Sequence, residues 1–472
     1  MMTLNASLLD MRFRPVRLIR SLFMVVLILF VFLNLHVLMN FEPRNTEIYD
    51  RTLLYKLRHS NILNAHVQID RSQLSDLNNQ DNYSKVEVLI LPNEYNQTFV
   101  SNKIQEHNLT EIKKEIDRRN SEQYVHNLQE FGLSLGPESV VIVVQVHDRA
   151  NYLKILLDSL RKVKGIEKTL LIFSHDVFSQ ELNSIIQSID FCPVMQIYFP
   201  VSAQLHPKEF PGEHPNDCPR NVKKDQAIKL KCNNANHPDK YGHYREAKYC
   251  QTKHHWFWKL FHVFDELTVM KNYTGLVLLL EEDYYVAPDI ITILQMMNHL
   301  KKSDKDCKDC RMLTAGNYDK TQSYSLNSGK VELGHWISSR HNMGMTFTKD
   351  LWKEIKKCSS EFCNFDDYNW DWTLQHLSMK CIPDKIKVMK MKATRVFHIG
   401  ECGVHHKGKN CQPDNKKKQI EGQLQSNKHH LFPNVLAVGG QSKFKLRDPK
   451  PNGGWGDIRD RELCLSFAKG HH

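Results

Sequence analysis

The stretch SVVIVVQV, from Ser139 to Val146, decides the fold class of this chain. It is a continuous apolar run rich in β-branched residues, which is typical of a strand buried on both faces of a parallel sheet. The segment RANYLKILLDSLRK follows it, with apolar residues at helical spacing. A buried strand followed directly by an amphipathic helix is the first half of a βαβ unit.

The same alternation continues along the chain. TLLIFS (169–174) and VMQIYF (194–199) predict two further strands with the helix ELNSIIQSI between them, and GLVLLL (275–280) predicts another strand after the aromatic helix HHWFWKLFHVFDEL. This order predicts an α/β domain with a Rossmann-like, doubly wound and largely parallel central sheet. A polar, Pro-rich segment from 200 to 250 interrupts the pattern and is expected to be a functional or disulfide-stapled loop.

Toward the N-terminus, residues 21–41 contain no charged residue. About 20 apolar residues suffice for a helix to cross a bilayer, and no small-x-small cleavage site follows, so we expect a transmembrane signal anchor and not a cleaved signal peptide. Arg12, Arg14, Arg17 and Arg20 precede the anchor, which predicts a cytoplasmic N-terminus and a single-pass type II topology. The expected parts are a cytoplasmic tail (1–20), the anchor (21–41), a lumenal stem (42–135) and a lumenal folded domain (136–472).

Cysteines and glycosylation sequons agree with this topology. All 12 cysteines lie beyond the anchor, and an even set of cysteines is typical of disulfides formed in an oxidising compartment. The stem is polar, lacks cysteine and is expected to contain a helix around residues 111–128. Asn5 would be cytoplasmic and unused. The sequons predicted to be lumenal are Asn82, Asn96, Asn108 and Asn272.

The overall composition limits the possible classes of protein. A hydrophobic content of 41% with 25% charged residues is ordinary for a globular chain, and the presence of only 20 Gly and 17 Pro excludes collagen-like, low-complexity or wholly disordered proteins. The 64 basic and 53 acidic residues give a modest net charge of +11. Because no nucleic-acid-binding motif accompanies this charge, we expect no nucleic-acid partner.

Polar residues follow three of the predicted strands. Glu281, Glu282 and Asp283 come directly after GLVLLL, while QVHDR (145–149) and SHD (174–176) end two other strands. Ligands in open α/β sheets bind outside the carboxyl ends of strands, where a carboxylate can hold a divalent cation against a diphosphate. The alternatives are a solvated acidic turn and helix capping by Asp148. No G-x-G-x-x-G follows the first strand, which disfavours a dinucleotide-binding fold.

Three further segments contain chemically active residues. In QTKHHWFWK (251–259), Lys253 is expected to meet phosphate charge, whereas zinc at His254 and His255 is disfavoured because adjacent helical residues point about 100° apart. FDDYNWDW (365–372) places carboxylates among aromatic rings, as saccharide sites do, with helix capping preferred for Asp366 and Asp367. His398 offers a nitrogen that would suit Mn²⁺ together with a carboxylate, although a structural role stays open for a lone histidine.

The motifs together resemble the N-acetylglucosaminyltransferase II family (glycosyltransferase family 16) over about Val140 to Cys464. The segments that carry the resemblance are LIFSHD, YGHYREAKYCQTKHHWFWK, LEED, HNMG (341–344), DDYNWDWTLQ and NGGWGDIRD (452–460). The resemblance implies a GT-A fold for 136–472, a Golgi location, a UDP-GlcNAc donor and an N-glycan acceptor. It also implies inverting transfer of GlcNAc to O2 of the α-1,6-arm mannose, forming a β-1,2 bond.

The resemblance assigns roles residue by residue. Asp371 would be the catalytic base, Asp283 and His398 would bind Mn²⁺, and Asn342 and Trp370 would contact the acceptor. Gln322 stands where the family carries a substrate-contacting arginine, which puts acceptor affinity in question. The implied donor-binding residues are Gln145, Val146, His147, Asp148, Arg149, Asp176, Gln251, Thr252, Lys253, His254, His255 and Glu282.

The same resemblance implies five disulfides and leaves two cysteines outside them. Cys192 would stay free, and Cys250, where serine is expected, would either pair or remain a thiol. The implied pairs are Cys218–Cys232, Cys307–Cys310, Cys358–Cys381, Cys363–Cys464 and Cys402–Cys411. The competing functions are a related β-1,2 transferase acting on the α-1,3 arm or on O-mannose, a glycosidase with paired carboxylates, and a non-catalytic Golgi lectin.

Overall fold

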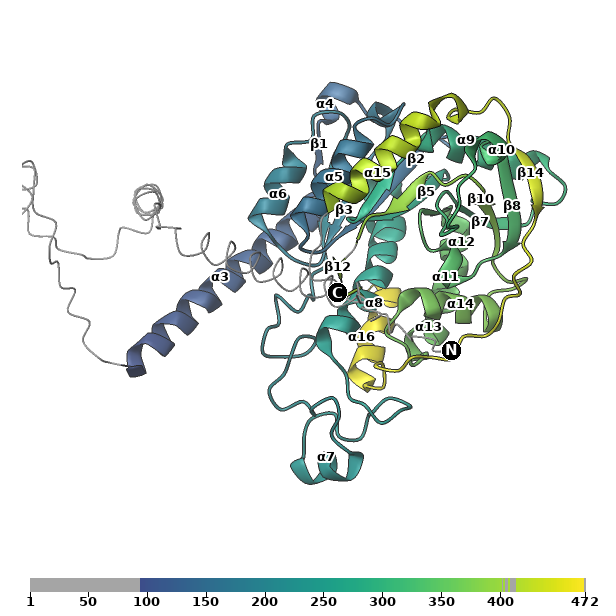
Figure 1. Cartoon of the computed structure of the whole chain (residues 1–472). Coiled ribbons are helices and arrows are strands. Elements are labelled where there is room, and N and C mark those ends of the chain that lie inside the picture. The colour runs from purple at the N-terminus through teal and green to yellow at the C-terminus, as the bar shows by residue number, and fades with distance from the viewer. Residues whose placement is uncertain (1–93, 401, 404–405, 408–412, 471–472) are drawn as a thin grey trace, which may run out of the picture. The chain divides into compact units, whose positions relative to one another are not determined.

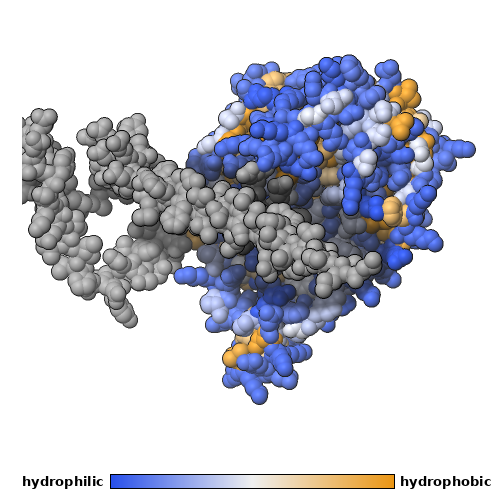
Figure 2. All heavy atoms as spheres, in the orientation of Figure 1, coloured by the Kyte–Doolittle hydropathy of each residue, from blue (hydrophilic) through white to orange (hydrophobic). Residues whose placement is uncertain are grey.

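The computed structural model describes residues 94–400, 402–403, 406–407 and 413–470 of the chain (Figure 1). Within these ranges no helix is both long and apolar enough to cross a bilayer. The predicted tail and anchor and most of the predicted stem lie outside the described residues. The described part presents a mostly hydrophilic surface in the view of Figure 2.

A ten-stranded sheet forms the centre of the domain, in the order β1-β4-β3-β2-β5-β9-β7-β10-β8-β14. Strands β4, β3, β2 and β5 are parallel neighbours, whereas β9 is antiparallel to both β5 and β7. The predicted parallel sheet is therefore confirmed for these four strands, and the sheet as a whole is mixed. Its strands are β1 Val125–His126, β2 Val140–Val146, β3 Leu171–His175, β4 Val194–Tyr198, β5 Leu276–Glu281, β7 Cys310–Thr314, β8 Lys330–His335, β9 Met345–Phe347, β10 Lys387–Met391 and β14 Ala437–Gln441.

Strand β2 shows why the central run is apolar throughout. Its residues Val141 and Val143 belong to one hydrophobic cluster, while Ile142 and Val144 belong to another. Alternate side chains of a strand point to opposite faces, so both faces of β2 are buried. Helices α5 (Ala150–Leu160), α6 (Gln180–Gln187) and α9 (Ile290–Ser303) contribute to the second cluster, and α8 (Ala247–Phe261) and α14 (Trp370–Lys380) to the first. The prediction of helices on both faces is confirmed.

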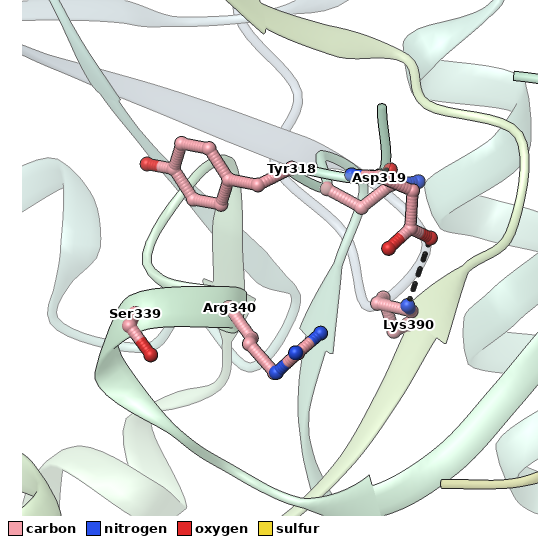
Figure 3. A pocket seen from close by; sticks show the side chains of 6 residues that line it. Tyr318, Asp319, Ser339, Arg340 and Lys390 are labelled. Carbon is pink, nitrogen blue, oxygen red and sulfur yellow. Dashed lines mark hydrogen bonds and ion pairs between the residues drawn. The ribbon is translucent and has the colours of Figure 1, made fainter. Parts of the chain in front are cut away.

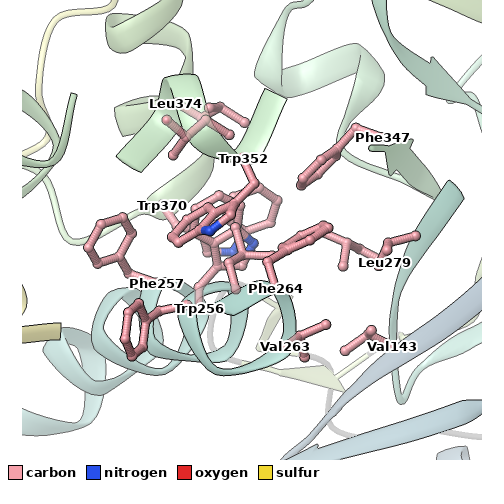
Figure 4. Close-up of a cluster of buried hydrophobic side chains, with 14 of the residues drawn as sticks. Val143, Trp256, Phe257, Val263, Phe264, Leu279, Phe347, Trp352, Trp370 and Leu374 are labelled. Carbon is pink, nitrogen blue, oxygen red and sulfur yellow. The ribbon is translucent and has the colours of Figure 1, made fainter. Parts of the chain in front are cut away.

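Aromatic side chains dominate the cluster between α8 and α14 (Figure 4). Trp256 of α8 stacks on Trp370 of α14 with ring centroids 4.6 Å apart. Phe257 and Phe264 both pack against Trp352 from α12 (Lys349–Lys357). The stacked pair fixes α14 against α8, so the orientation of α14 is set by the core.

The segment before β2 is packed on the sheet. Helix α3 (Glu94–Glu122) reaches β4, where Asn120 donates from Nδ2 to the Tyr198 carbonyl (2.7 Å) and accepts from the Tyr198 N–H (2.9 Å). Strand β1 then pairs with β4, and α4 (Leu128–Phe131) follows. The compact body thus includes part of the predicted stem, and the functional boundary near residue 135 stays a prediction.

Four predicted disulfides are present in the structure, Cys218–Cys232, Cys307–Cys310, Cys358–Cys381 and Cys363–Cys464. The first staples the long segment between β4 and α8, which includes the short helix α7 (Lys224–Leu230). Cys192 and Cys250 are buried free thiols. The predicted Cys402–Cys411 pair lies outside the residues whose side chains are described.

Candidate active site

Polar residues that follow β2, β3 and β5 meet at one edge of the sheet. The three strands are parallel neighbours in the order β3-β2-β5, so their carboxyl ends lie side by side. Glu282 accepts the backbone N–H of His147 (2.8 Å), and His147 Nδ1 lies 2.7 Å from Asp176 Oδ1. The structure thus brings together the three strand ends that the sequence singled out. We call His147, Arg149, Asp176, Glu282, Asp283 and His398 the strand-end cluster.

Arg149 links the two buried carboxylates after β5. Its Nε donates to Glu282 Oε1 (2.6 Å) and its Nη1 donates to Asp283 Oδ2 (2.8 Å). Glu282 and Asp283 are only 1% and 3% exposed. Burial raises the pKa of Glu282, and the Arg149 charge opposes this shift. Removing the guanidinium would therefore leave two carboxylates poorly compensated.

Asp283 and His398 are adjacent although 115 positions separate them. Strand β11 (Val396–His398) pairs antiparallel with β6 (Tyr284–Val286), which sets His398 opposite Tyr284. His398 Nε2 consequently lies 3.2 Å from Asp283 Oδ2. Burial raises the pKa of Asp283, but the His398 hydrogen bond and the Arg149 charge together bring it below its usual value.

Two observations fit a cation at this pair. Asp283 Oδ1 is buried and has no hydrogen-bond partner among the described residues. A Cβ at Gly400 would collide with Asp283 Oδ2 and approach His398 Nε2 to 2.8 Å, so glycine keeps this space open. The described residues contain no group of three or more metal-ligating side chains. One carboxylate and one imidazole therefore fit a cation that takes its other ligands from a substrate.

Asp176 connects the cluster to helix α8. Gln251 Nε2 donates to Asp176 Oδ2 (3.0 Å), and His255 Nδ1 lies 3.7 Å from the same oxygen. The hydrogen bond to Asp176 raises the pKa of His147 to about 9. Gln145 accepts from Lys259 Nζ (2.7 Å) and so faces the core. Among the remaining predicted donor residues, Asp148 is exposed, Thr252 is half-buried and Val146 is buried.

Lys253 and His254, which were predicted to contact the donor, make their polar contacts elsewhere than in the strand-end cluster. Lys253 is fully buried, and its Nζ donates to the carbonyl oxygens of Phe365 (3.0 Å) and Asp367 (2.8 Å). Its ammonium lies 4.3 Å from the centroid of the Trp455 ring. His254 Nε2 lies 3.0 Å from Asp460 Oδ1. Since an α-helix turns about 100° per residue, the predicted run could not point all its side chains the same way.

Asp371 lies in the first turn of α14, which begins within the aromatic FDDYNWDW segment. The backbone N–H of Trp372 donates to Asp371 Oδ1 (2.9 Å), and Asn342 Nδ2 lies 3.4 Å from Asp371 Oδ2. Burial raises the pKa of Asp371. Trp370 is 8% exposed, so its stacked ring leaves little surface for an acceptor.

Tyr318 was not predicted from sequence, yet it connects the two sides of the site. Its hydroxyl donates to Asn342 Oδ1 (2.9 Å). Partial burial of the half-exposed Tyr318 raises the pKa of its phenol, and the charges of Glu281, Asp371 and Asp283 raise it further. Carboxylates near the strand ends and the Asp371 carboxylate thus both raise the pKa of the Tyr318 phenol. The sequence signal that could have identified Tyr318 is its position in the loop between the buried strand β7 and Gln322, where the chain departs from the family.

Asp366 and Asp367 act as anchors for a distant loop, and the N-cap of α14 is instead Asn369, which makes no side-chain cap hydrogen bond. Asp367 Oδ1 accepts the N–H of Asn369, just before α14, and its Oδ2 accepts the N–H of Asn452 (2.7 Å). Asp366 accepts the N–H of Trp455 (3.0 Å). The NGGWGDIRD segment is thereby held next to α14.

Two cavities are lined by residues of the segments described above. The first, of about 150 Å³, we call the Arg340 pocket; it is lined by Asn317, Tyr318, Asp319, Ser339, Arg340 and Lys390 (Figure 3). The second, of about 280 Å³, we call the Tyr368 pocket. The rings of Tyr249 and Tyr368 lie 5.3 Å apart in it. Its lining residues are Arg220, Asp239, His243, Tyr244, Glu246, Tyr249, Tyr368, Asn452 and Gly454.

Known proteins resemble this chain over most of its described length. A family model described as N-acetylglucosaminyltransferase II matches residues 113–464. A Rattus norvegicus protein named alpha-1,6-mannosyl-glycoprotein 2-beta-N-acetylglucosaminyltransferase is 49% identical over 353 residues, covering 74% of this chain and 78% of the relative. Proteins of the same name from Homo sapiens and Arabidopsis thaliana are 46% and 34% identical, covering 74% and 71% of this chain and 78% and 76% of their own length.

A solved structure gives a much weaker similarity. The mannosyltransferase from Pyrobaculum calidifontis, in complex with GDP-Man and Mn²⁺, is 10% identical and covers 79% of this chain and 84% of its own. Its TM-score is 0.26.

Proposed function

The chain belongs to the N-acetylglucosaminyltransferase II family, and we propose that it transfers GlcNAc from UDP-GlcNAc to O2 of the α-1,6-arm mannose of the N-glycan core, forming a β-1,2 bond. It is a glycosyltransferase. Relatives named for this reaction support the proposal at the level of the family. The observation that carries it in this chain is the pairing of Asp283 with His398 at the strand ends, with the Asp371 carboxylate held through Asn342 and Tyr318.

The donor half of the proposal assigns a GT-A fold and places UDP-GlcNAc at the strand-end cluster. The parallel order β4-β3-β2-β5 with helices on both faces supports it, because nucleotides bind outside the carboxyl ends of such strands. His147 and Asp176 lie at the ends of β2 and β3 and offer both a donor and an acceptor to a base or ribose. Arg149 would hold Glu282 and Asp283 in place beside the diphosphate.

Asp283 and His398 would hold Mn²⁺ together with diphosphate oxygens. The unpartnered Asp283 Oδ1 and the space kept by Gly400 support this assignment. When bound, the ion would supply positive charge that stabilises UDP as a leaving group.

Asp371 is the general base of the proposed reaction. Its ionised carboxylate would accept the proton of mannose O2 as that oxygen bonds to the anomeric carbon, opposite the departing UDP. The Trp372 N–H and Asn342 Nδ2 approach the two carboxylate oxygens and hold their orientation. A positioned base of this kind typically contributes about 10² to 10⁴ in rate. Attack from the opposite face inverts the configuration, which yields the β product.

The Tyr368 pocket supports an acceptor larger than one sugar. Aromatic faces beside carboxylates and a histidine suit the C–H faces and hydroxyls of a saccharide. Asp366 and Asp367 fix the loop that forms one wall through Asn452. An N-glycan branch would reach such a pocket, whereas a single mannose would not fill both cavities.

The predicted surroundings of the enzyme complete the proposal. We place it in the Golgi membrane as a single-pass type II protein with 21–41 as its anchor, 42–135 as its stem and 136–472 as its lumenal catalytic domain. Asn108 and Asn272 are exposed, as glycosylation requires. Asn82 and the side chain of Asn96 lie outside the described residues.

Product analysis tests the proposed function. The chain would be incubated with UDP-GlcNAc, Mn²⁺ and N-glycans that differ in which mannose is free, and the products weighed by mass spectrometry. We expect one added GlcNAc only when the α-1,6-arm mannose is free, and none with EDTA. Transfer to the α-1,3 arm or to O-mannose would favour one of the related transferases. Glycan binding without turnover would favour a lectin, and glycan cleavage without the donor would favour a glycosidase.

A further inference from the structure

The Arg340 pocket is built from three parts of the chain that meet beside the proposed base. Asn317, Tyr318 and Asp319 follow β7, Ser339 and Arg340 belong to α11 (Ser338–His341), and Lys390 comes from β10. Figure 3 shows Asp319 and Lys390 joined by their ion pair, with Tyr318 and Arg340 on the other walls. None of these residues except Tyr318 has a part in the reaction described above.

Tyr318 is the wall that the pocket shares with the reaction centre. Its hydroxyl donates to Asn342 Oδ1 (2.9 Å), and Asn342 Nδ2 lies 3.4 Å from Asp371 Oδ2. The Tyr318 side of the pocket is therefore two polar contacts from the carboxylate that would meet the acceptor hydroxyl. A sugar bound in the pocket would therefore lie near the mannose that reacts at Asp371, as a neighbouring unit of the same glycan would.

The charges around the pocket sum to zero, with Lys390 and Arg340 balanced by Asp319 and Glu332, and this favours a neutral ligand. Lys390 Nζ lies 3.3 Å from both Asp319 Oδ2 and Glu332 Oε1, so the ammonium is already balanced. Arg340 lies over the Phe444 ring, 3.2 Å from its centroid, and has no ion pair in the part of the chain that the structure describes. Tyr318 is 47% exposed and offers a ring face. A ring, a carboxylate and a guanidinium together suit the C–H face and hydroxyls of a sugar.

Gln322 holds the loop that forms this pocket and does not itself line it. Its Nε2 donates to Asn317 Oδ1 (2.7 Å) and to the Asp319 carbonyl (2.9 Å), while its Oε1 accepts the N–H of Thr394 (3.1 Å). All three contacts are internal. Gln322 is thus a positioning residue, and the charged side chains left to meet a ligand are Asp319 and Arg340.

We propose that the Arg340 pocket is a saccharide subsite that binds a neutral hexose unit adjoining the mannose that receives GlcNAc. The proposal rests on the proposed function, because it assumes a glycan acceptor at Asp371. Arg340 would donate to hydroxyls of this unit, Asp319 would accept from them, and the Tyr318 ring would cover one sugar face.

The test compares Arg340→Ala with Arg161→Ala. Arg161 is a matched control because it also lies over a ring, 4.8 Å from the Phe191 centroid, on helix-flanking surface unrelated to the site. For Arg340→Ala we expect the KM for a branched N-glycan to rise roughly tenfold, the size of a lost hydrogen bond to a charged group. The KM for UDP-GlcNAc and its slow hydrolysis by water should stay at wild-type values, as should all values for Arg161→Ala.

Further arms separate the possible failures. Asp319→Asn should also raise the glycan KM, and it serves as the test if Arg340→Ala does not fold. An unchanged glycan KM in the folded variants would overturn the subsite, as would stronger competition by a sulfated or phosphorylated glycan than by its neutral form. Absence of GlcNAc transfer in the wild-type chain would instead contradict the proposed function.

Discussion

The strand-end cluster and the Asp371 side of the site are built in different ways. In the cluster, residues at the ends of neighbouring strands bind one another closely, with Arg149 joining Glu282 and Asp283 at 2.6 and 2.8 Å. On the other side, Asp371 is reached from the side chain of Asn342 at 3.4 Å, through residues on short helices and a loop. The strand ends thus hold charged side chains in close mutual contact, whereas the proposed reaction requires the Asp371 carboxylate to be available to the acceptor.

The largest effect should come from removing the base. Asp371→Asn keeps the shape of the side chain and its contact with the Trp372 N–H, but the amide is a far weaker base. We expect transfer to fall by about 10² to 10⁴, with donor binding by calorimetry unchanged. Equal losses of donor binding and transfer would show that the two sides are not separate.

A change in the strand-end cluster should weaken donor binding, which the change at Asp371 should leave intact. Asp283→Asn removes a charge from the proposed ion site, so Mn²⁺-dependent UDP binding should weaken by at least the ~10- to 100-fold seen for outer-shell groups. Calorimetry with and without Mn²⁺ measures this. Asp158→Asn, an exposed aspartate paired with Lys417, is the control that should bind normally. Wild-type activity of Asp283→Asn at limiting Mn²⁺ would rule out the ligand.

Acidification should lower transfer by protonating Asp371. Burial raises the pKa of Asp371 above the ordinary aspartate value of about 4. Because the ionised form is the base, transfer is full above this raised pKa and falls about tenfold per unit below it. A pH profile of kcat, with donor binding followed over the same range, checks this. An acid limb at or below the ordinary aspartate pKa would contradict the assignment.

Lys253 should affect stability and leave donor affinity alone. Its ammonium satisfies two buried carbonyl oxygens, so Lys253→Met should lower the free energy of unfolding by about 1 to 3 kcal/mol. UDP affinity of the folded variant should match the wild type. Lys259→Met provides a comparison on the same helix as Lys253. It removes the buried ammonium that donates to Gln145 of β2. A folded Lys253→Met chain that no longer binds UDP would instead support the predicted contact between Lys253 and a phosphate.

The two regions also differ in how far the sequence predicts them. The run Val140–Val146 announces a strand buried on both faces, and the convergence of His147, Asp176 and Glu282 follows because parallel strand ends share one edge. The antiparallel insertion of β9 could not be foreseen, since Met345–Phe347 is too short to signal pairing with two strands.

Loops and helix rotation account for what the sequence missed. The approach of Asp283 and His398 depends on pairing of β6 with β11, which no local pattern encodes and which the family resemblance supplied. Tyr318 acts through a loop held by Gln322. The direction of the Lys253 side chain is set by its contacts with the carbonyl oxygens of Phe365 and Asp367, which the pattern of α8 alone does not reveal.

The linkage of the product tests the central claim most directly. After incubation of the chain with UDP-GlcNAc, Mn²⁺ and an N-glycan with a free α-1,6-arm mannose, NMR of the purified product reads both the anomeric configuration and the substituted oxygen. Attack by mannose O2 opposite UDP, assisted by Asp371, predicts a single β-linked GlcNAc at O2. An α linkage, or GlcNAc on another oxygen, would contradict the account.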